Sequence, residues 1–259
     1  LKPTFERRFL WSPYARVGSK TPLICPQPEG VYVFEGSGFD HLRLFDHKGR
    51  YVRTIYPFPA GQVEKVRGLK HHTFPQSDKS LPLKGGFYEA TLLTSGYTGV
   101  RSKYEEPRLG TGSGAMAVCN GRIALPCLRL NRLATDGSSG GLVFEGPETA
   151  VTATWRRTKE ERKVPPRSAA LSPDGKMLYL TGFAWDNGHE GENFEWIHAV
   201  TRMDLSGGKP PELFAGNLKQ GDDQAGSDNE HLNGPSCVDC DAQGRVYVAD
   251  HFNDRVQVF

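Results

Sequence analysis

The stretch that decides the fold closes the chain: Leu232-Asn-Gly-Pro-Ser-Cys-Val-Asp-Cys-Asp-Ala-Gln-Gly-Arg-Val-Tyr-Val-Ala-Asp-His-Phe-Asn-Asp-Arg-Val-Gln-Val-Phe259. Valine, tyrosine and phenylalanine alternate in it with small or polar residues, which is the pattern of half-buried β-strands. The turn Asp241-Ala-Gln-Gly244 and the polar loop Asp250–Asp254 divide it into three strands. The stretch therefore predicts an antiparallel sheet that is one strand short of four.

Three further stretches carry the same pattern. Gly30-Val-Tyr-Val-Phe-Glu35 and His41-Leu-Arg-Leu-Phe-Asp46 align with Val246–Asp250 and Arg255–Phe259, so that Glu35 takes the position of Asp250. This copy continues into Tyr51–Phe58, the outer strand that the terminal copy lacks. The strands expected in the other two copies are Ser168–Ser172, Met177–Thr181, Ala199–Asp204 and Pro211–Ala215, and Ala115–Cys119, Gly121–Leu125, Asn131–Thr135 and Gly141–Glu145.

Four copies of such a unit predict an all-β fold, a β-propeller of four-stranded antiparallel blades. We expect a single propeller domain over residues 1–259, with units near 19–60, 114–146, 166–216 and 233–259, as part of an incomplete ring. An insertion over 61–113, with an expected strand at Phe87–Thr94, does not fit the repeat. Residues 151–166 are expected to form a solvated connector with at most a short helical turn.

The terminal motifs resemble the NHL repeat, a blade of the six-bladed TolB-like and SMP-30-like propellers. The resemblance rests on Gly234-Pro235, Gly244–Asp250 and Asn253–Phe259. It implies six blades in the full ring and a ligand held on the loop face near the central channel. It also implies export, to an extracellular or periplasmic compartment. It implies no single activity, because propellers host many unrelated ones.

Composition narrows the classes of partner. The formal charge of +2, from 32 basic and 30 acidic residues, gives no electrostatic basis for binding nucleic acid. No apolar run approaches the roughly 20 residues that span a bilayer. Five cysteines are too few for a disulfide scaffold. We therefore expect no nucleic-acid partner and no membrane span, and a partner that is a small molecule, a glycan, or a protein or peptide.

Strand direction indicates where a ligand would bind. Strands alternate in direction within a blade, so the loop between the second and third strands shares a face with the connection to the next blade. Segments 184–198, 216–234 and 250–254 should gather there, together with the shorter loop 35–40 of the first unit. Two tryptophans in the first segment indicate a lid that grips a ligand, or else aromatic rings packed on the blade below. The candidate ligand-binding residues are Trp185, Asp186, His189, Glu190, Trp196, His198, His231 and His251.

Two metal hypotheses apply to the same segments. Asp222, Asp223, Asp228 and Glu230 would suit calcium, but without the spacing of a known calcium loop, which favours a plain loop. The histidines 189, 198, 231 and 251 would suit zinc or general-base chemistry, but no zinc-binding spacing links them. Amidating lyases and gluconolactonase-like enzymes, which resemble this chain, place a metal in the channel. Their ligand patterns do not match here.

Two further pairs have structural interpretations. Cys237 and Cys240 lie three apart on a strand, point to opposite faces and are expected to be packing positions. Asp250 and Arg255 flank a loop that a carboxylate–guanidinium contact would hold.

The sequence thus predicts a binding or scaffold propeller. The alternative is a metal-dependent hydrolase or lyase with its site at the channel mouth, and no motif decides whether the chain is an enzyme.

Overall fold

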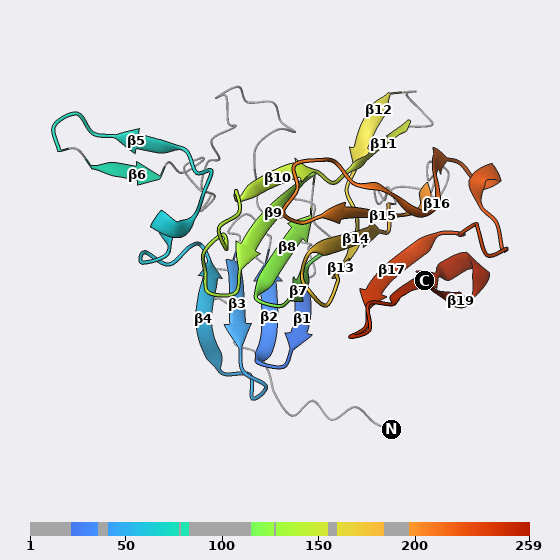
Figure 1. The fold of residues 1–259 in the computed structure, drawn as a ribbon, viewed down its shortest axis with the longest axis horizontal. Helices are drawn as coiled ribbons and strands as arrows, with labels where there is room; N and C mark the ends of the chain where they lie inside the picture. Colours follow the sequence, from blue (N-terminus) through green and yellow to red (C-terminus); the bar gives the residue numbers. More distant parts are fainter. Residues whose placement is uncertain are drawn as a thin grey trace. The chain divides into compact units, whose positions relative to one another are not determined.

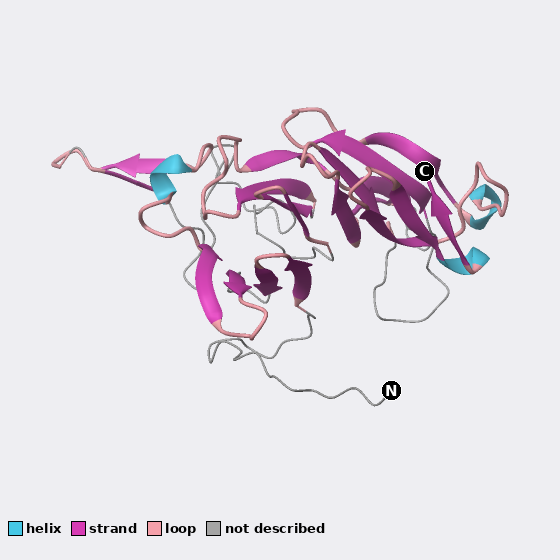
Figure 2. Cartoon of the chain, turned by 60° about the horizontal axis from the view of Figure 1, so that its bottom comes forward, coloured by secondary structure: helices cyan, strands magenta, loops and turns pink. Residues whose placement is uncertain are grey.

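The computed structural model describes residues 22–35, 41–77, 79–82, 115–126, 128–154, 160–183 and 197–259. Its regular structure consists almost entirely of strands, with three short 3-10 helices in the described ranges (Figure 2). Antiparallel sheets of four, four, four and three strands follow one another along the chain (Figure 1). The predicted all-β fold of four-stranded propeller blades is therefore confirmed, and within the described ranges the last sheet has three strands.

The strand order in the four blades is β1-β2-β3-β4, β10-β9-β8-β7, β13-β14-β15-β16 and β17-β18-β19. The first blade contains β1 (Leu23–Gln27), β2 (Gly30–Glu35), β3 (His41–Phe45) and β4 (Tyr51–Tyr56), and the second contains β7 (Ala117–Cys119), β8 (Arg122–Pro126), β9 (Arg129–Ala134) and β10 (Glu145–Glu148). The third contains β13 (Ser168–Leu171), β14 (Met177–Thr181), β15 (Ile197–Asp204) and β16 (Glu212–Gln220), and the last contains β17 (Pro235–Cys240), β18 (Val246–Asp250) and β19 (Arg255–Val258). The remaining elements are the hairpins β5 (His71–Thr73)–β6 (Ser80–Pro82) and β11 (Val151–Thr154)–β12 (Glu161–Val164), and the 3-10 helices η1 (Val63–Lys65), η2 (Asp222–Gln224) and η3 (His251–Asn253).

The chain divides into two compact units. Unit 1 comprises Leu1–Thr111 and Leu133–Phe144, and unit 2 comprises Gly112–Arg132 and Glu145–Phe259. Unit 1 contains the first blade, and its core includes Tyr56 and Phe144, whose stacked rings lie 6.3 Å apart. The assignment of the whole chain to one propeller domain stays a prediction.

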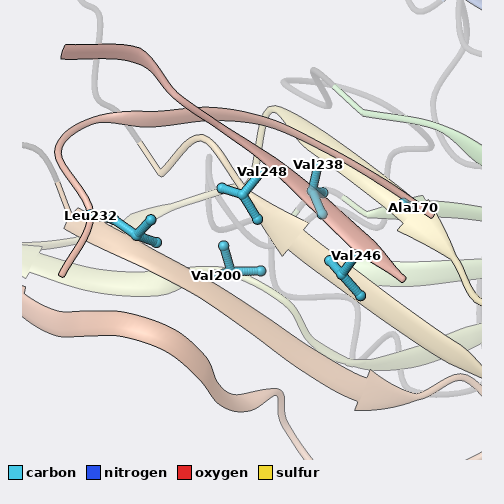
Figure 3. Close-up of a cluster of buried hydrophobic side chains, with 6 residues drawn as sticks. All are labelled: Ala170, Val200, Leu232, Val238, Val246 and Val248. Carbon is cyan, nitrogen blue, oxygen red and sulfur yellow. The ribbon is translucent and has the colours of Figure 1, made fainter. Parts of the chain in front are cut away.

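Unit 2 shows how blades pack on each other. β13 lies against β7 and β8 of the second blade and against β17 of the last. The contact with the last blade is an apolar cluster in which small and β-branched side chains of facing sheets interdigitate (Figure 3). Its buried members are Ala170, Val200, Leu232, Val238, Val246 and Val248. The alternation read from the last stretch thus places the valines of β18 in the core between two blades.

The first and last blades also share a turn in which an aspartate side chain accepts backbone hydrogen bonds. Asp46, between β3 and β4, accepts hydrogen bonds from the backbone N–H groups of Lys48 and Arg50, both at 2.8 Å. Asp241, between β17 and β18, accepts from the N–H groups of Gln243 and Arg245 at 2.9 and 3.0 Å. An aspartate followed by Gly three residues on is a frequent turn signal, which is why both turns are visible in the sequence.

Three expectations about strands differ from the structure. The predicted strand Gly141–Glu145 is wrong, because Gly140 and Gly141 have positive φ and the outer strand β10 begins at Glu145. The outer strand of the third blade continues past Ala215 to Gln220. Within 151–166, the described residues Val151–Thr154 and Glu161–Val164 pair as the antiparallel strands β11 and β12, where a solvated connector was expected. The expected strand Phe87–Thr94 lies outside the described residues.

One side chain joins that hairpin to the third blade. The amide of Gln220, the last residue of β16, accepts a hydrogen bond from the N–H of Thr154 at 2.7 Å and donates one to its carbonyl oxygen at 2.8 Å. The side chain of Gln220 therefore pairs with Thr154 as a neighbouring strand would. Hairpin β11–β12 is attached in this way to the start of the segment that leads into the last blade.

Candidate functional site

The predicted loop face is partly within the described residues. Trp185, Asp186, His189, Glu190 and Trp196 lie outside them. His198, at the start of β15, and the segment 221–234, which we call the connector, are described and belong to unit 2, as does the β18–β19 loop.

Asp250 is the centre of the site. Its carboxylate is fully buried at the end of β18 and accepts a 2.6 Å hydrogen bond from the backbone N–H of Asn233 in the connector. It also accepts from Asn253 Nδ2 and from Arg255 Nε, each at 2.8 Å. The predicted contact between Asp250 and Arg255 is therefore present, and it extends to the connector, which the sequence did not indicate.

Arg255 holds the connector from the other side. Its guanidinium donates to three connector carbonyl groups, those of Ser227 and Asp228 at 2.6 Å each and that of His231 at 3.1 Å. A planar guanidinium presents several donors in fixed directions, which suits it to bind several backbone oxygens while one edge pairs with a carboxylate. Arg255 is thus the main link between β19 and the connector.

Asn253 and Gln257 complete this network, and neither was singled out from the sequence. Asn253 Nδ2 donates to the Gly226 carbonyl at 2.8 Å, and Gln257 Nε2 donates to the His231 carbonyl at 3.1 Å. The only local signal was the period of two that places Arg255 and Gln257 on one face of β19. The connector to which these side chains bind lies more than twenty residues earlier, and no signal in the sequence indicated this contact.

His198 binds the backbone at the end of the connector. The imidazole is 1% exposed, and its Nδ1 accepts a 2.9 Å hydrogen bond from the backbone N–H of Gly234. Its Nε2 is buried without a hydrogen-bond partner of good geometry among the described residues. Burial lowers the pKa of His198, and this outweighs the opposing effects of Asp222, the Gly221 backbone and Asp250. His198 is therefore neutral near pH 7.

Two glycines make this arrangement sterically feasible. Gly216 has a φ of +77°, and a Cβ built there would collide with the carbonyl oxygen of His198. Gly234 has a φ of +63°, and a Cβ there would collide with the ring of Phe252. Both positions require the left-handed conformation and have no room for a side chain. These two glycines allow β16 and the connector to lie close to His198.

The other two described candidates lie at the surface. His231 Nδ1 is 2.8 Å from both carboxylate oxygens of Asp228, and this contact is the leading cause that lowers the pKa of Asp228. His251, in η3, is exposed and its ring is 4.9 Å from that of Phe252. The structure therefore brings His198 and His231 to the connector, one buried at its end and one exposed on it, while His251 lies on the adjoining loop.

Of the two predictions that a cysteine packs in the core, one agrees with the structure and one does not. Cys240 is partly buried, packs on the apolar cluster, and has a pKa raised by burial to about 12. Cys237 is exposed, with Ser168 Oγ 3.5 Å from its sulfur, so its assignment to the core was wrong. The strand places it on the face opposite Val238, away from the apolar cluster.

In the described ranges, no group of three or more His, Cys, Asp or Glu side chains gathers in a way that could hold a metal ion. The four acids suggested for calcium all lie in the described connector, whereas the zinc hypothesis includes His189, which lies outside the described residues. Both metal hypotheses stay predictions. No helix in the described ranges is long and apolar enough to cross a membrane.

Comparison with known proteins yields little. No protein-family model and no curated protein matches the chain. A crystal structure of the tricorn protease is similar over 88% of this chain, at 11% sequence identity and a TM-score of 0.21. The match covers 27% of that chain's length. A likeness this low supports no argument, so the propeller assignment rests on the sheets themselves.

Proposed function

We propose that the chain is a binding or scaffold module that holds a ligand or protein partner on the loop face of a propeller. The observation that carries the proposal is the fixed connector. Asp250, Arg255 and His198 use buried or partly buried polar groups to hold the connector's backbone in one conformation. Preorganised loops on a rigid scaffold reduce the conformational entropy lost on binding.

We infer further that the ring is of NHL type and has six blades in full. The repeated strands and turns of the first and last blades support this, as do the exposed Val256 and Val258 of β19. These are apolar side chains on the blade face that would meet a next blade. The ligand class stays open among small molecules, glycans and peptides, and a secreted location is the expectation that accompanies the resemblance.

The test uses the two tryptophans of the predicted lid. A glycan array and a displayed peptide library would first yield a ligand, and titration calorimetry would then compare Trp185→Ala and Trp196→Ala with the native protein. We expect each substitution to weaken binding about tenfold or more, since buried tryptophans dominate many interfaces. Trp155→Ala is the matched control, because it removes a tryptophan outside the lid. Unchanged affinity in both lid variants, with unchanged circular dichroism, would exclude the lid from the binding site.

The enzyme alternative, a metal-dependent hydrolase or lyase, has no supporting observation in the described part of the chain. Elemental analysis of the purified protein separates the two functions. Calcium or zinc bound at one equivalent would favour the enzyme. Binding to a glycan or peptide by metal-free protein would favour the module.

A further inference from the structure

His198 is the one described candidate residue that is buried and whose hydrogen bond depends on its protonation state. A neutral imidazole that accepts through Nδ1 carries its hydrogen on Nε2. When the ring gains a proton, Nδ1 becomes a donor and points at the N–H of Gly234, which is also a donor. Two donors 2.9 Å apart cannot share a hydrogen bond, so the contact is lost.

We propose that His198 is a proton-sensitive latch: its neutral ring holds the connector at Gly234, and protonation releases the connector from the loop face. This inference concerns the regulation of the proposed binding face and rests on that function for its biological meaning. His198 acts through the connector and is a positioning residue. Its partner is a backbone group, so the latch depends on the position of Gly234 and on no particular side chain of the connector.

The surroundings of the ring favour the neutral form. The charged groups that act on it from the described elements are Asp222 of the connector and Asp250 of β18. Asp250 is already paired with Arg255. β16 is irregular opposite His198, between the pairs Ile197–Gln220 and Ala199–Gly216, and its charged residue there, Lys219, is exposed. Burial outweighs both carboxylates, and the pKa of His198 is lowered in the latched state.

The sign of the pH dependence follows from this shift. The latched state binds a proton less readily than a released state with an ordinary histidine pKa of about 6.5. Above that pH both states are neutral at His198, and the latch does not depend on pH. Between about 6.5 and the lower pKa of the latched ring, the released state binds more protons, so the latch weakens as the pH falls.

Amide hydrogen exchange measured by NMR tests the latch without any ligand. We expect the protection factor of the Gly234 amide to be constant above about pH 6.5 and to fall by up to about tenfold per pH unit below it. It should stay below the protection factor of Val248 in β18, because release opens only the connector. The amide of Leu44, in unit 1, is the control and should show no such slope.

Three variants separate the latch from other causes. His198→Asn places an amide oxygen near the position of Nδ1 and does not titrate, so Gly234 should stay protected at about pH 5.5, below the ordinary histidine pKa. His198→Leu removes the acceptor, and Gly234 should exchange fast at every pH. His231→Asn removes the nearby exposed histidine and should leave the slope unchanged.

The latch would be overturned if the protection factor of the Gly234 amide in the native protein did not fall below about pH 6.5. It would also be overturned if the same fall persisted in His198→Asn. Equal protection of Gly234 and Val248 at all pH values would also overturn it, because the connector would then not open separately. Loss of ligand binding in the tryptophan variants concerns the binding face alone. The two proposals therefore fail in different experiments.

Discussion

The first and last blades share a sequence pattern, but the side chains at matching positions are buried to different extents. Leu42 and Leu44 of β3 occupy the positions of Val256 and Val258 of β19, as the strand registers show. The leucines are 0% and 3% exposed, whereas the valines are 62% and 53% exposed. In the last blade, apolar residues suited to burial therefore face outward in the described structure. The difference in burial arises from what covers the strand, since both pairs of side chains are branched and apolar.

The acidic residues at the ends of the second strands differ as well. Glu35 is 8% exposed and accepts one hydrogen bond, from Arg43 at 3.3 Å, while its Oε1 has no partner among the described residues. Asp250 is fully buried and has close donors from the connector, from η3 and from β19. The same repeat position is a simple ion pair in one blade and the centre of a network in the other. The network is what connects the last blade to the candidate site.

The largest expected effect comes from breaking the network. Asp250→Ala should lower the free energy of unfolding by about 3–5 kcal/mol, because the Asn233 N–H, the Asn253 amide and the Arg255 guanidinium all lose a fully buried acceptor. The matched change Glu35→Ala in the first blade should cost only about 1 kcal/mol, since one hydrogen bond is lost. Urea unfolding followed by circular dichroism measures both. Equal losses would show that the two acids have the same role.

The exposed face of β19 gives the next contrast. Leu42→Ala should cost about 2–5 kcal/mol, as is usual for a leucine in a packed core. Val256→Ala should cost less than about 0.5 kcal/mol if its face is open to solvent. Thermal and urea unfolding of the two variants would show this. A cost at Val256 comparable to that at Leu42 would mean that the face of the last blade is covered in solution.

A smaller effect is expected from exchanging the arginines for lysine. Arg255→Lys keeps the charge but loses the fork that reaches three carbonyl oxygens and a carboxylate, and should cost about 2 kcal/mol. Arg43→Lys, in the first blade, should cost less than about 1 kcal/mol, because lysine keeps the charge beside Glu35 and Arg43 makes only one hydrogen bond to it. Hydrogen exchange should also show faster exchange in residues 226–233 for Arg255→Lys alone. Protection unchanged there would remove Arg255 from its role as the main link.

Local patterns predicted most of the fold and little of the site. Alternation and Asp-to-Gly turns identified the strands around Val31, Leu178 and Val246, because both signals lie within a short stretch of chain. The strand before Glu145 was misplaced, since apolar Leu142 to Phe144 imitate a strand that the positive φ of Gly140 and Gly141 prevents. The bond between His198 and Gly234 joins residues 36 positions apart, and no periodic pattern encodes it.

The site residues show the same limit. Asp250 and Arg255 could be paired in advance, because five residues and a tight loop separate them. Their attachment to the connector could not, since backbone carbonyl groups carry no sequence signature. His198 is a ligand-binding candidate in the sequence by its residue type and its loop. Its buried position and its backbone partner became apparent only from the fold.

The pairing of Gln220 with Thr154 puts a side chain in the place of a strand backbone. Two hydrogen bonds from a single amide side chain attach hairpin β11–β12 to the end of β16. Exchanging Gln220 for alanine would remove both of these bonds while leaving every backbone bond of the blade in place. The variant would therefore measure how much this one side chain contributes to holding the hairpin, whose Ala153 and Val164 stay buried.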